Sequence, residues 1–141
     1  MIDKVMLIDD DVFCNRLNTL TIEQLKFAKA TMVFECAEEA LDYLRQQVRH
    51  GKEETFPDLI LLDLSMAHMN GWDFLNHFDE FPARYKNRTS ICILTSSIAV
   101  VDREAAALRP DVISYLVKPL SSDDLKMIVS SMPPLLRKSK F

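Results

Sequence analysis

The stretch DLILLDLSMAHMNG (residues 58–71) places a single carboxylate, that of Asp63, where an apolar run meets a polar loop. An ionisable side chain at such a boundary is costly unless it is paired, binds a metal or takes part in chemistry. The run before Asp63 is continuous in apolar residues rather than alternating, which is typical of a strand covered on both faces of a parallel sheet. The stretch therefore predicts a parallel α/β sheet with a functional carboxylate at its edge.

Apolar runs of strand length recur along the chain. The five predicted strands are KVMLI (4–8), ATMVFEC (30–36), DLILL (58–62), SICIL (90–94) and ISYLV (113–117). Segments with helical periodicity lie between them, the weakest being the Ala-rich segment 99–108. Because strands that alternate with single helices pair in parallel through right-handed crossovers, we predict a doubly wound (βα)5 five-stranded parallel sheet, a flavodoxin-like α/β fold.

Two of the predicted helices carry further local signals. Phe13, Leu17 and Leu20 follow a helical period, so we expect them to face the core. Ser121 and Asp124 have the spacing of a capping box, which predicts the start of the last helix.

The segment after Gly71 is predicted to begin as a helix with Trp72 and Phe74 toward the core. We expect FDEFPARYKNR (78–88) to be the end of that helix and a solvated charged loop. Neither part requires a functional role.

Composition narrows the class of protein. The chain has 141 residues, of which 48% are hydrophobic, enough for one domain with a full core. Its net charge of -4 argues against nucleic-acid binding, which needs a basic footprint. No apolar segment is long enough for a membrane span, and the three scattered cysteines (Cys14, Cys36 and Cys92) are expected to be small buried hydrophobes in a reducing compartment. We therefore predict a soluble cytoplasmic protein.

Polar side chains follow four of the predicted strands. They are Asp9, Asp10 and Asp11 after the first, Asp63 after the third, Thr95 and Ser96 after the fourth, and Lys118 after the fifth. The carboxyl ends of parallel strands share one edge, so these groups should converge. Two carboxylates about 4 Å apart repel by about 4 kcal/mol at an effective dielectric near 20, so the cluster calls for a cation, and its hard oxygen ligands favour Mg²⁺, or Mn²⁺. A carboxylate, a divalent metal, a lysine and a hydroxyl together indicate phosphoryl transfer to Asp63.

Four blocks of the sequence carry a family resemblance. LIDDD (7–11), LLDLSMAHMNG (61–71), ILTSS (93–97) and YLVKPL (115–120) resemble the signature blocks of the response-regulator receiver domain of two-component signalling, in that family's order and near its spacing. The resemblance covers essentially the whole chain. It implies a receiver domain over residues 1–132 and a short C-terminal tail, 133–141, without an output domain.

The resemblance also implies roles for individual residues. Asp63 falls on the phosphoacceptor, and Asp10, assisted by Asp9, falls on the metal ligands together with Asp63 and the backbone carbonyl of Ser65. Lys118 falls on the lysine that binds the phosphoryl group, and its bond to Pro119 resembles the family's cis peptide.

Thr95 and Tyr115 fall on the hydroxyl and aromatic positions of the family's switch. The implied function is acceptance of a phosphoryl group from a sensor histidine kinase or a histidine phosphotransfer protein. Slow self-dephosphorylation follows, so the protein is not expected to be an enzyme. The signal is expected to leave through a downstream protein, or through a phosphorylation-dependent homodimer. Either would use the face formed by the helix after Thr95, the fifth strand and the last helix, from about Val100 to Met132.

Two departures from the family pattern stand out. Ala67 replaces the usual Pro in the loop after the phosphoacceptor, and LRPDVIS (108–114), before the fifth strand, is about one residue longer than usual. One alternative is a phosphatase of the haloacid-dehalogenase type with Asp9 as nucleophile and Asp11 as acid. Against it, the acidic pair Asp123–Asp124 lies inside a predicted helix. The other alternative is a degenerate receiver that acts only as a docking module, although the set of site residues is complete.

Overall fold

The computed structural model describes residues 1–133 and forms one parallel sheet. The strands are β1 (Ile2–Ile8), β2 (Ala28–Phe34), β3 (Leu59–Leu62), β4 (Ser90–Thr95) and β5 (Val112–Val117). Their order in the sheet is β2-β1-β3-β4-β5, with every neighbouring pair parallel. The predicted doubly wound, flavodoxin-like α/β fold is confirmed. Of the predicted tail 133–141, residues 134–141 lie outside the described residues.

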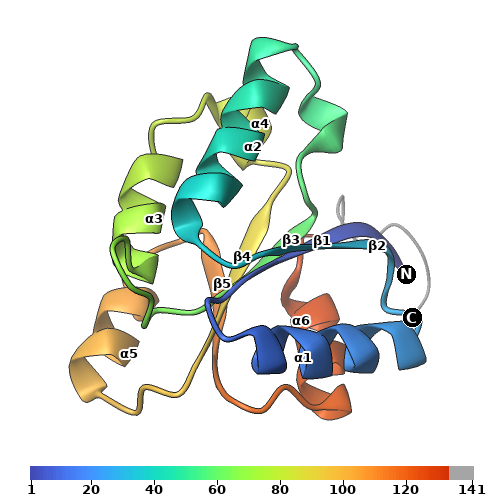
Figure 1. Ribbon diagram of the computed structural model, residues 1–141, viewed down its shortest axis with the longest axis vertical. Helices are drawn as coiled ribbons and strands as arrows, with labels where there is room; N and C mark the ends of the chain where they lie inside the picture. The colour runs from blue at the N-terminus through green and yellow to red at the C-terminus, as the bar shows by residue number, and fades with distance from the viewer. Residues whose placement is uncertain (134–141) are drawn as a thin grey trace.

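Helices cover both faces of this sheet (Figure 1). They are α1 (Val12–Gln24), α2 (Ala37–Arg49), α3 (Gly71–Phe78), α4 (Ala83–Lys86), α5 (Val100–Ala107) and α6 (Ser122–Ser131), with the 3-10 helix η1 (Glu53–Thr55) after α2. Figure 1 shows α1 and α6 together on one side of the sheet, and α2 with α3 on the other. Within the described residues, no helix is long and apolar enough to cross a membrane.

The strands divide the apolar core in two. Alternate side chains of β1 point to opposite faces, so Val5 and Leu7 pack with α1 and α6, whereas Met6 and Ile8 pack with α2 and α3. All residues of β3 and β4 are buried, as their continuous apolar runs predict, while β2 and β5 are partly exposed at the two sheet edges.

The prediction for the buried face of α1 was wrong. Phe13, Leu17 and Leu20 are exposed, Phe13 to 69%, and the face turned to the sheet carries Asn15, Asn18 and Ile22. The side-chain amide of Asn15 donates to the backbone carbonyl of Asp9 at 2.8 Å. A helix face that binds the backbone of a neighbouring loop uses polar residues, and a hydrophobic periodicity does not reveal such a face.

The prediction for residues 78–88 was also wrong in part. The segment contains α4, and both Phe81 and Tyr85 are buried. The Tyr85 ring lies 5.0 Å from the ring of Phe56, centroid to centroid, and its hydroxyl donates to the carbonyl of Val48 at 3.4 Å. Two aromatic anchors therefore fix a segment whose charged residues suggested a solvated loop.

Several local features of the structure match or depart from the sequence-based predictions. The capping box of Ser121 and Asp124 is present, and the Lys118–Pro119 peptide is cis. Only Cys92 of the three cysteines is buried, since Cys14 and Cys36 are partly exposed.

The stretch LRPDVIS contains a register shift in which Ile91 pairs with Val112 but Cys92 pairs with Ser114. Ile113 is thus an extra residue, accommodated as an irregularity of the β-bulge type at the edge of the sheet.

Candidate functional site

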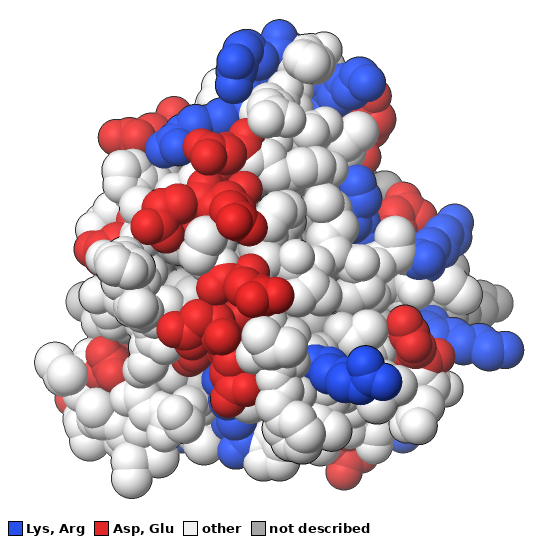
Figure 2. Space-filling view, viewed as in Figure 1, with Lys and Arg blue, Asp and Glu red and all other residues white. Residues whose placement is uncertain are grey.

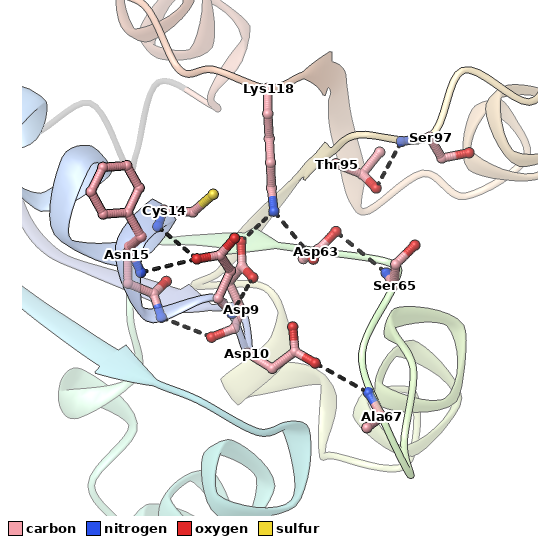
Figure 3. Close-up of polar contacts among 12 residues, drawn as sticks. Asp9, Asp10, Cys14, Asn15, Asp63, Ser65, Ala67, Thr95, Ser97 and Lys118 are labelled. Atoms are coloured by element: carbon pink, nitrogen blue, oxygen red, sulfur yellow. Dashed lines mark hydrogen bonds and ion pairs between the residues drawn. The ribbon is translucent and has the colours of Figure 1, made fainter.

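The acidic cluster forms where β1 and β3 end side by side. Ile8 pairs with Leu62, so the next residues, Asp9 and Asp63, emerge next to each other. Both are buried, and Asp10 beside them is exposed. Carboxylate oxygens of the three residues all lie within 4.8 Å of one another. Figure 3 shows their side chains turned toward a common point at this edge.

Lys118 reaches the same point from the end of β5. Its Nζ lies 2.6 Å from Asp9 Oδ2 and 3.3 Å from Asp63 Oδ2 (Figure 3). Its backbone N–H donates to the carbonyl of Thr95 at 2.9 Å, which ties the end of β5 to the end of β4. The ends of three strands that are distant in sequence, β1, β3 and β5, thus supply the side chains of one compact polar site.

Burial and like charge both act on this site. Burial raises the pKa of Asp9 most, and the charge of Asp63 raises it further, against the opposing hydrogen bonds from Lys118 and the Asp11 amide. Burial alone would lower the pKa of Lys118, but the hydrogen bond to Asp9 and the charges of Asp63 and Asp9 outweigh it, so the pKa is raised. One ammonium group faces three carboxyl groups, so the donor set fits a divalent cation of the Mg²⁺ type.

The loop between β3 and α3 closes one side of the cluster. The Ser65 amide donates to Asp63 Oδ1 and the Ala67 amide donates to Asp10 Oδ2, both at 3.3 Å. A proline at position 67 has no N–H, so the second contact depends on the departure from the family pattern. His68, in the same loop, has a left-handed φ of 65°.

Gly71 sets the start of α3 against the site. A Cβ on this residue would lie 2.6 Å from the carbonyl oxygen of Asp63 and 2.8 Å from Leu64 Cα. Only a glycine permits this approach, in which the Gly71 amide donates to the Leu64 carbonyl at 3.0 Å. The helix itself is capped by Asn70 in a capping box with Asp73.

Asp11 has a structural role. It is the N-cap of α1, and its Oδ1 accepts hydrogen bonds from the amides of Phe13 and Cys14 at 3.0 and 3.1 Å. Hydrogen bonds from the Cys14 and Phe13 amides lower its pKa, which fits a charged cap. A carboxylate held in this way is poorly suited to donate a proton, as the phosphatase alternative requires of it.

Thr95 and Tyr115 meet through the residue Ser97. The Ser97 amide donates to Thr95 Oγ1 at 3.3 Å, and the Tyr115 hydroxyl donates to the Ser97 carbonyl at 3.0 Å. Thr95 is fully buried, and the guanidinium of Arg103 lies 4.9 Å from the centroid of the Tyr115 ring. The two predicted switch residues are thus linked to each other through Ser97.

Sequence reasoning missed the side chains that hold Ser97. Its hydroxyl donates to Asp102 at 2.6 Å, and Asp102 also accepts from the Trp72 indole at 3.2 Å. Trp72 was predicted as core packing, and nothing in the local sequence pairs it with a residue 30 positions later.

The surface around the site is acidic. Figure 2 shows Asp and Glu side chains gathered on this face, over the end of β1 and, next to it, over the start of α2. The exposed acidic residues of these two segments are Asp10, Asp11, Glu35, Glu38 and Glu39. A cation bound at the cluster would therefore be attracted by its surroundings as well as by its ligands.

Comparisons with known proteins agree with this geometry. Residues 5–130 match the model of the response regulator receiver domain family. A two-component response regulator from Cytophaga hutchinsonii is 29% identical, with a TM-score of 0.83 over 92% of this chain and 95% of that one. A response regulator receiver protein from Dyadobacter fermentans is 28% identical, with a TM-score of 0.79 over 90% and 94% of the two chains.

Among curated proteins, the probable methanogenesis regulatory protein FilR2 of Methanothrix harundinacea is 29% identical over 91% of this chain and 79% of its own length. The probable C4-dicarboxylate response regulator DctR of Halalkalibacterium halodurans is 27% identical, and the chain spans only 53% of it. Together with the parallel sheet and the acidic pocket, the family match shows that this chain belongs to the response regulator receiver domain family.

Proposed function

We propose that the chain accepts a phosphoryl group on Asp63 from a phosphohistidine of a sensor histidine kinase or a histidine phosphotransfer protein. The observation that carries the proposal is the position of Asp63, which is buried beside Asp9 and 3.3 Å from the ammonium group of Lys118. A carboxylate in this setting combines a nucleophile with a nearby positive charge, which is what transfer of an anionic group requires.

In the proposed reaction, a carboxylate oxygen of Asp63 attacks the phosphorus atom. The bond between phosphorus and the imidazole nitrogen of the donor breaks, and its electron pair leaves with the imidazole. Lys118 balances the charge of the phosphoryl oxygens, and the buried hydroxyl of Thr95 donates a hydrogen bond to one of them. The product is an acyl phosphate, which water hydrolyses slowly.

The acidic cluster supports a requirement for metal. Asp9, Asp10 and Asp63, whose oxygens lie within 4.8 Å of one another, would hold Mg²⁺ or Mn²⁺ together with the backbone carbonyl of Ser65. Bound there, the ion supplies positive charge that offsets the negative charge of the transferring group.

We propose that the signal leaves through the face formed by α5, β5 and α6. Exposed apolar side chains on and beside these helices, including Val100, Val101, Leu108 and Met127, support this assignment. A downstream protein, or a second copy of the chain, would bury them when Asp63 is phosphorylated.

Labelling with acetyl phosphate and Mg²⁺ tests the proposal against its alternatives. We expect the wild type to gain one phosphoryl group, measured as intact mass, and Asp63→Asn to gain none while it keeps the circular dichroism of the wild type. Loss of labelling in Asp9→Asn with full labelling in Asp63→Asn would favour the phosphatase. No labelling of the folded wild type would favour a degenerate receiver.

A further inference from the structure

We propose that Asp102 is a positioning residue for the phosphorylation switch, because it fixes Ser97 and, through Ser97, the hydroxyl of Thr95. The inference rests on the function proposed above. It assigns a role to three side chains, Trp72, Ser97 and Asp102, that lie outside the cluster of carboxylates.

The two carboxylate oxygens of Asp102 bind two different elements. Oδ2 accepts from the Ser97 hydroxyl at 2.6 Å, in the loop between β4 and α5. Oδ1 accepts from the Trp72 indole N–H at 3.2 Å, in the first turn of α3. Since Asp102 itself lies in the first turn of α5, one side chain joins α3, α5 and the loop between β4 and α5.

All three polar groups of Ser97, its amide, carbonyl and hydroxyl, make hydrogen bonds. Its hydroxyl donates to Asp102 and accepts from the Ala99 amide at 3.3 Å. Its amide donates to Thr95 Oγ1 at 3.3 Å, and its carbonyl accepts from the Tyr115 hydroxyl at 3.0 Å. Ser97 is therefore the point through which Asp102 acts on both predicted switch residues.

The contact with Thr95 has a direct consequence for phosphate binding. A hydroxyl oxygen that already accepts the Ser97 N–H has its own proton directed elsewhere, so the proton is free to be donated to a phosphoryl oxygen on Asp63. Figure 3 shows Thr95 and Asp63 at the same edge of the sheet, with Ser97 on the far side of Thr95. Asp102 thus preorganises a donor before the phosphoryl group arrives.

The contacts from Asp102 to Ser97 and Trp72 favour one arrangement of the loop between β4 and α5 over arrangements in which this loop is free. A ligand that needs the first arrangement binds more weakly when that arrangement is less populated. Hydrogen bonds to a charged group are stronger than neutral ones, and the loss of two of them is enough for about a tenfold change in affinity.

Beryllofluoride with Mg²⁺ is the probe, since it mimics the acyl phosphate without turnover. We expect isothermal titration calorimetry to give about tenfold weaker binding to Asp102→Ala than to the wild type. Asp123→Ala is the matched control, because Asp123 is an exposed acidic residue in the first turn of α6, and it should bind like the wild type. Asp102→Asn keeps an acceptor for the Ser97 hydroxyl and should fall between.

A double-mutant cycle separates this role from a general structural one. If Asp102 acts through Ser97, then Asp102→Ala should add little to the effect of Ser97→Ala on beryllofluoride affinity. Amide hydrogen exchange at residues 95–99, measured without phosphate mimic, should be faster in Asp102→Ala and unchanged in Asp123→Ala.

The outcomes distinguish the two proposals. Unchanged or tighter beryllofluoride binding by Asp102→Ala, or additive effects with Ser97→Ala, would overturn the role of Asp102. No beryllofluoride binding by the wild type would overturn the proposed function instead, and the exchange at residues 95–99 would still show whether Asp102 holds the loop; unchanged exchange there overturns the inference by itself.

Discussion

An aspartate lies at each end of β3, and the surroundings of the two carboxylates differ. Asp58 precedes the strand and Asp63 follows it, and their exposed fractions are 2% and 4%. Asp58 Oδ2 accepts the backbone amides of Asp3 and Lys4 at 2.8 and 3.2 Å, so it joins β1 to the start of β3. Asp63 instead faces other carboxylates, and its own carboxylate contacts Lys118 and the Ser65 amide at 3.3 Å each. Burial alone does not identify a functional carboxylate. We infer that the mark of such a carboxylate is a negative charge that its hydrogen-bond donors and cations offset only in part.

The largest effect on the free energy of unfolding should come from replacing Asp58, whose carboxylate accepts two backbone amides. Asp58→Ala leaves two amides without their acceptor, and we expect it to lower the free energy of unfolding by about 3 kcal/mol, measured by urea denaturation. Asp63→Ala should change it far less in metal-free buffer, because it also removes repulsion from Asp9. Equal losses at both positions would contradict the distinction between the two ends.

Mg²⁺ should stabilise the protein by binding the carboxylates at the end of β3 where Asp63 lies. Because the ion binds the assembled cluster, an excess of a hundred times its Kd should add about 2.7 kcal/mol to the free energy of unfolding. We expect the resulting rise in Tm to disappear in Asp10→Asn and to persist in Glu38→Gln, a nearby exposed acidic residue in the first turn of α2. A full Mg²⁺ response in Asp10→Asn would remove Asp10 from the site.

A smaller effect should appear in the pH dependence of metal-free stability. The folded pKa of Asp9 is raised above the ordinary value of 3.8, so its stabilising contribution is complete below that pH and is lost as pH rises through the folded pKa. Lys118, with its own raised pKa, stays protonated throughout.

The Tm of Asp9→Asn should therefore rise relative to that of the wild type as pH increases from about 4 to 7. Thermal melts at matched ionic strength, without divalent metal, measure this difference. A Tm of Asp9→Asn that falls relative to that of the wild type over the same range would show that pairing with Lys118 outweighs burial.

The smallest effect concerns the Ala67 amide, which donates to Asp10 Oδ2. Ala67→Pro removes this donor and should weaken Mg²⁺ binding on the order of threefold, as expected for one partly exposed hydrogen bond. Ala67→Ser keeps the amide and is the control in the same calorimetric titration. Stronger binding by the proline variant would mean that the amide withholds Asp10 from the metal.

Much of this arrangement could be predicted because it depends on strand ends. Apolar runs located all five strands, and parallel order brings the residues that follow them together, as it does Asp9, Asp63 and Lys118. The polar face of α1 was missed because Asn15 packs through a hydrogen bond to a carbonyl rather than through apolar contact. The bridge from Trp72 to Asp102 was missed because it joins two helices whose relative rotation no local pattern specifies.

The most direct test of the central claim is to locate the acyl phosphate. Wild-type protein would be treated with acetyl phosphate and Mg²⁺, reduced with borohydride and digested, and the peptides analysed by mass spectrometry. Borohydride converts a phosphorylated aspartate to homoserine, so we predict homoserine at position 63 and unmodified aspartate at positions 9 and 58. Homoserine at position 9, or at neither end of β3, would contradict the claim that Asp63 is the phosphoacceptor.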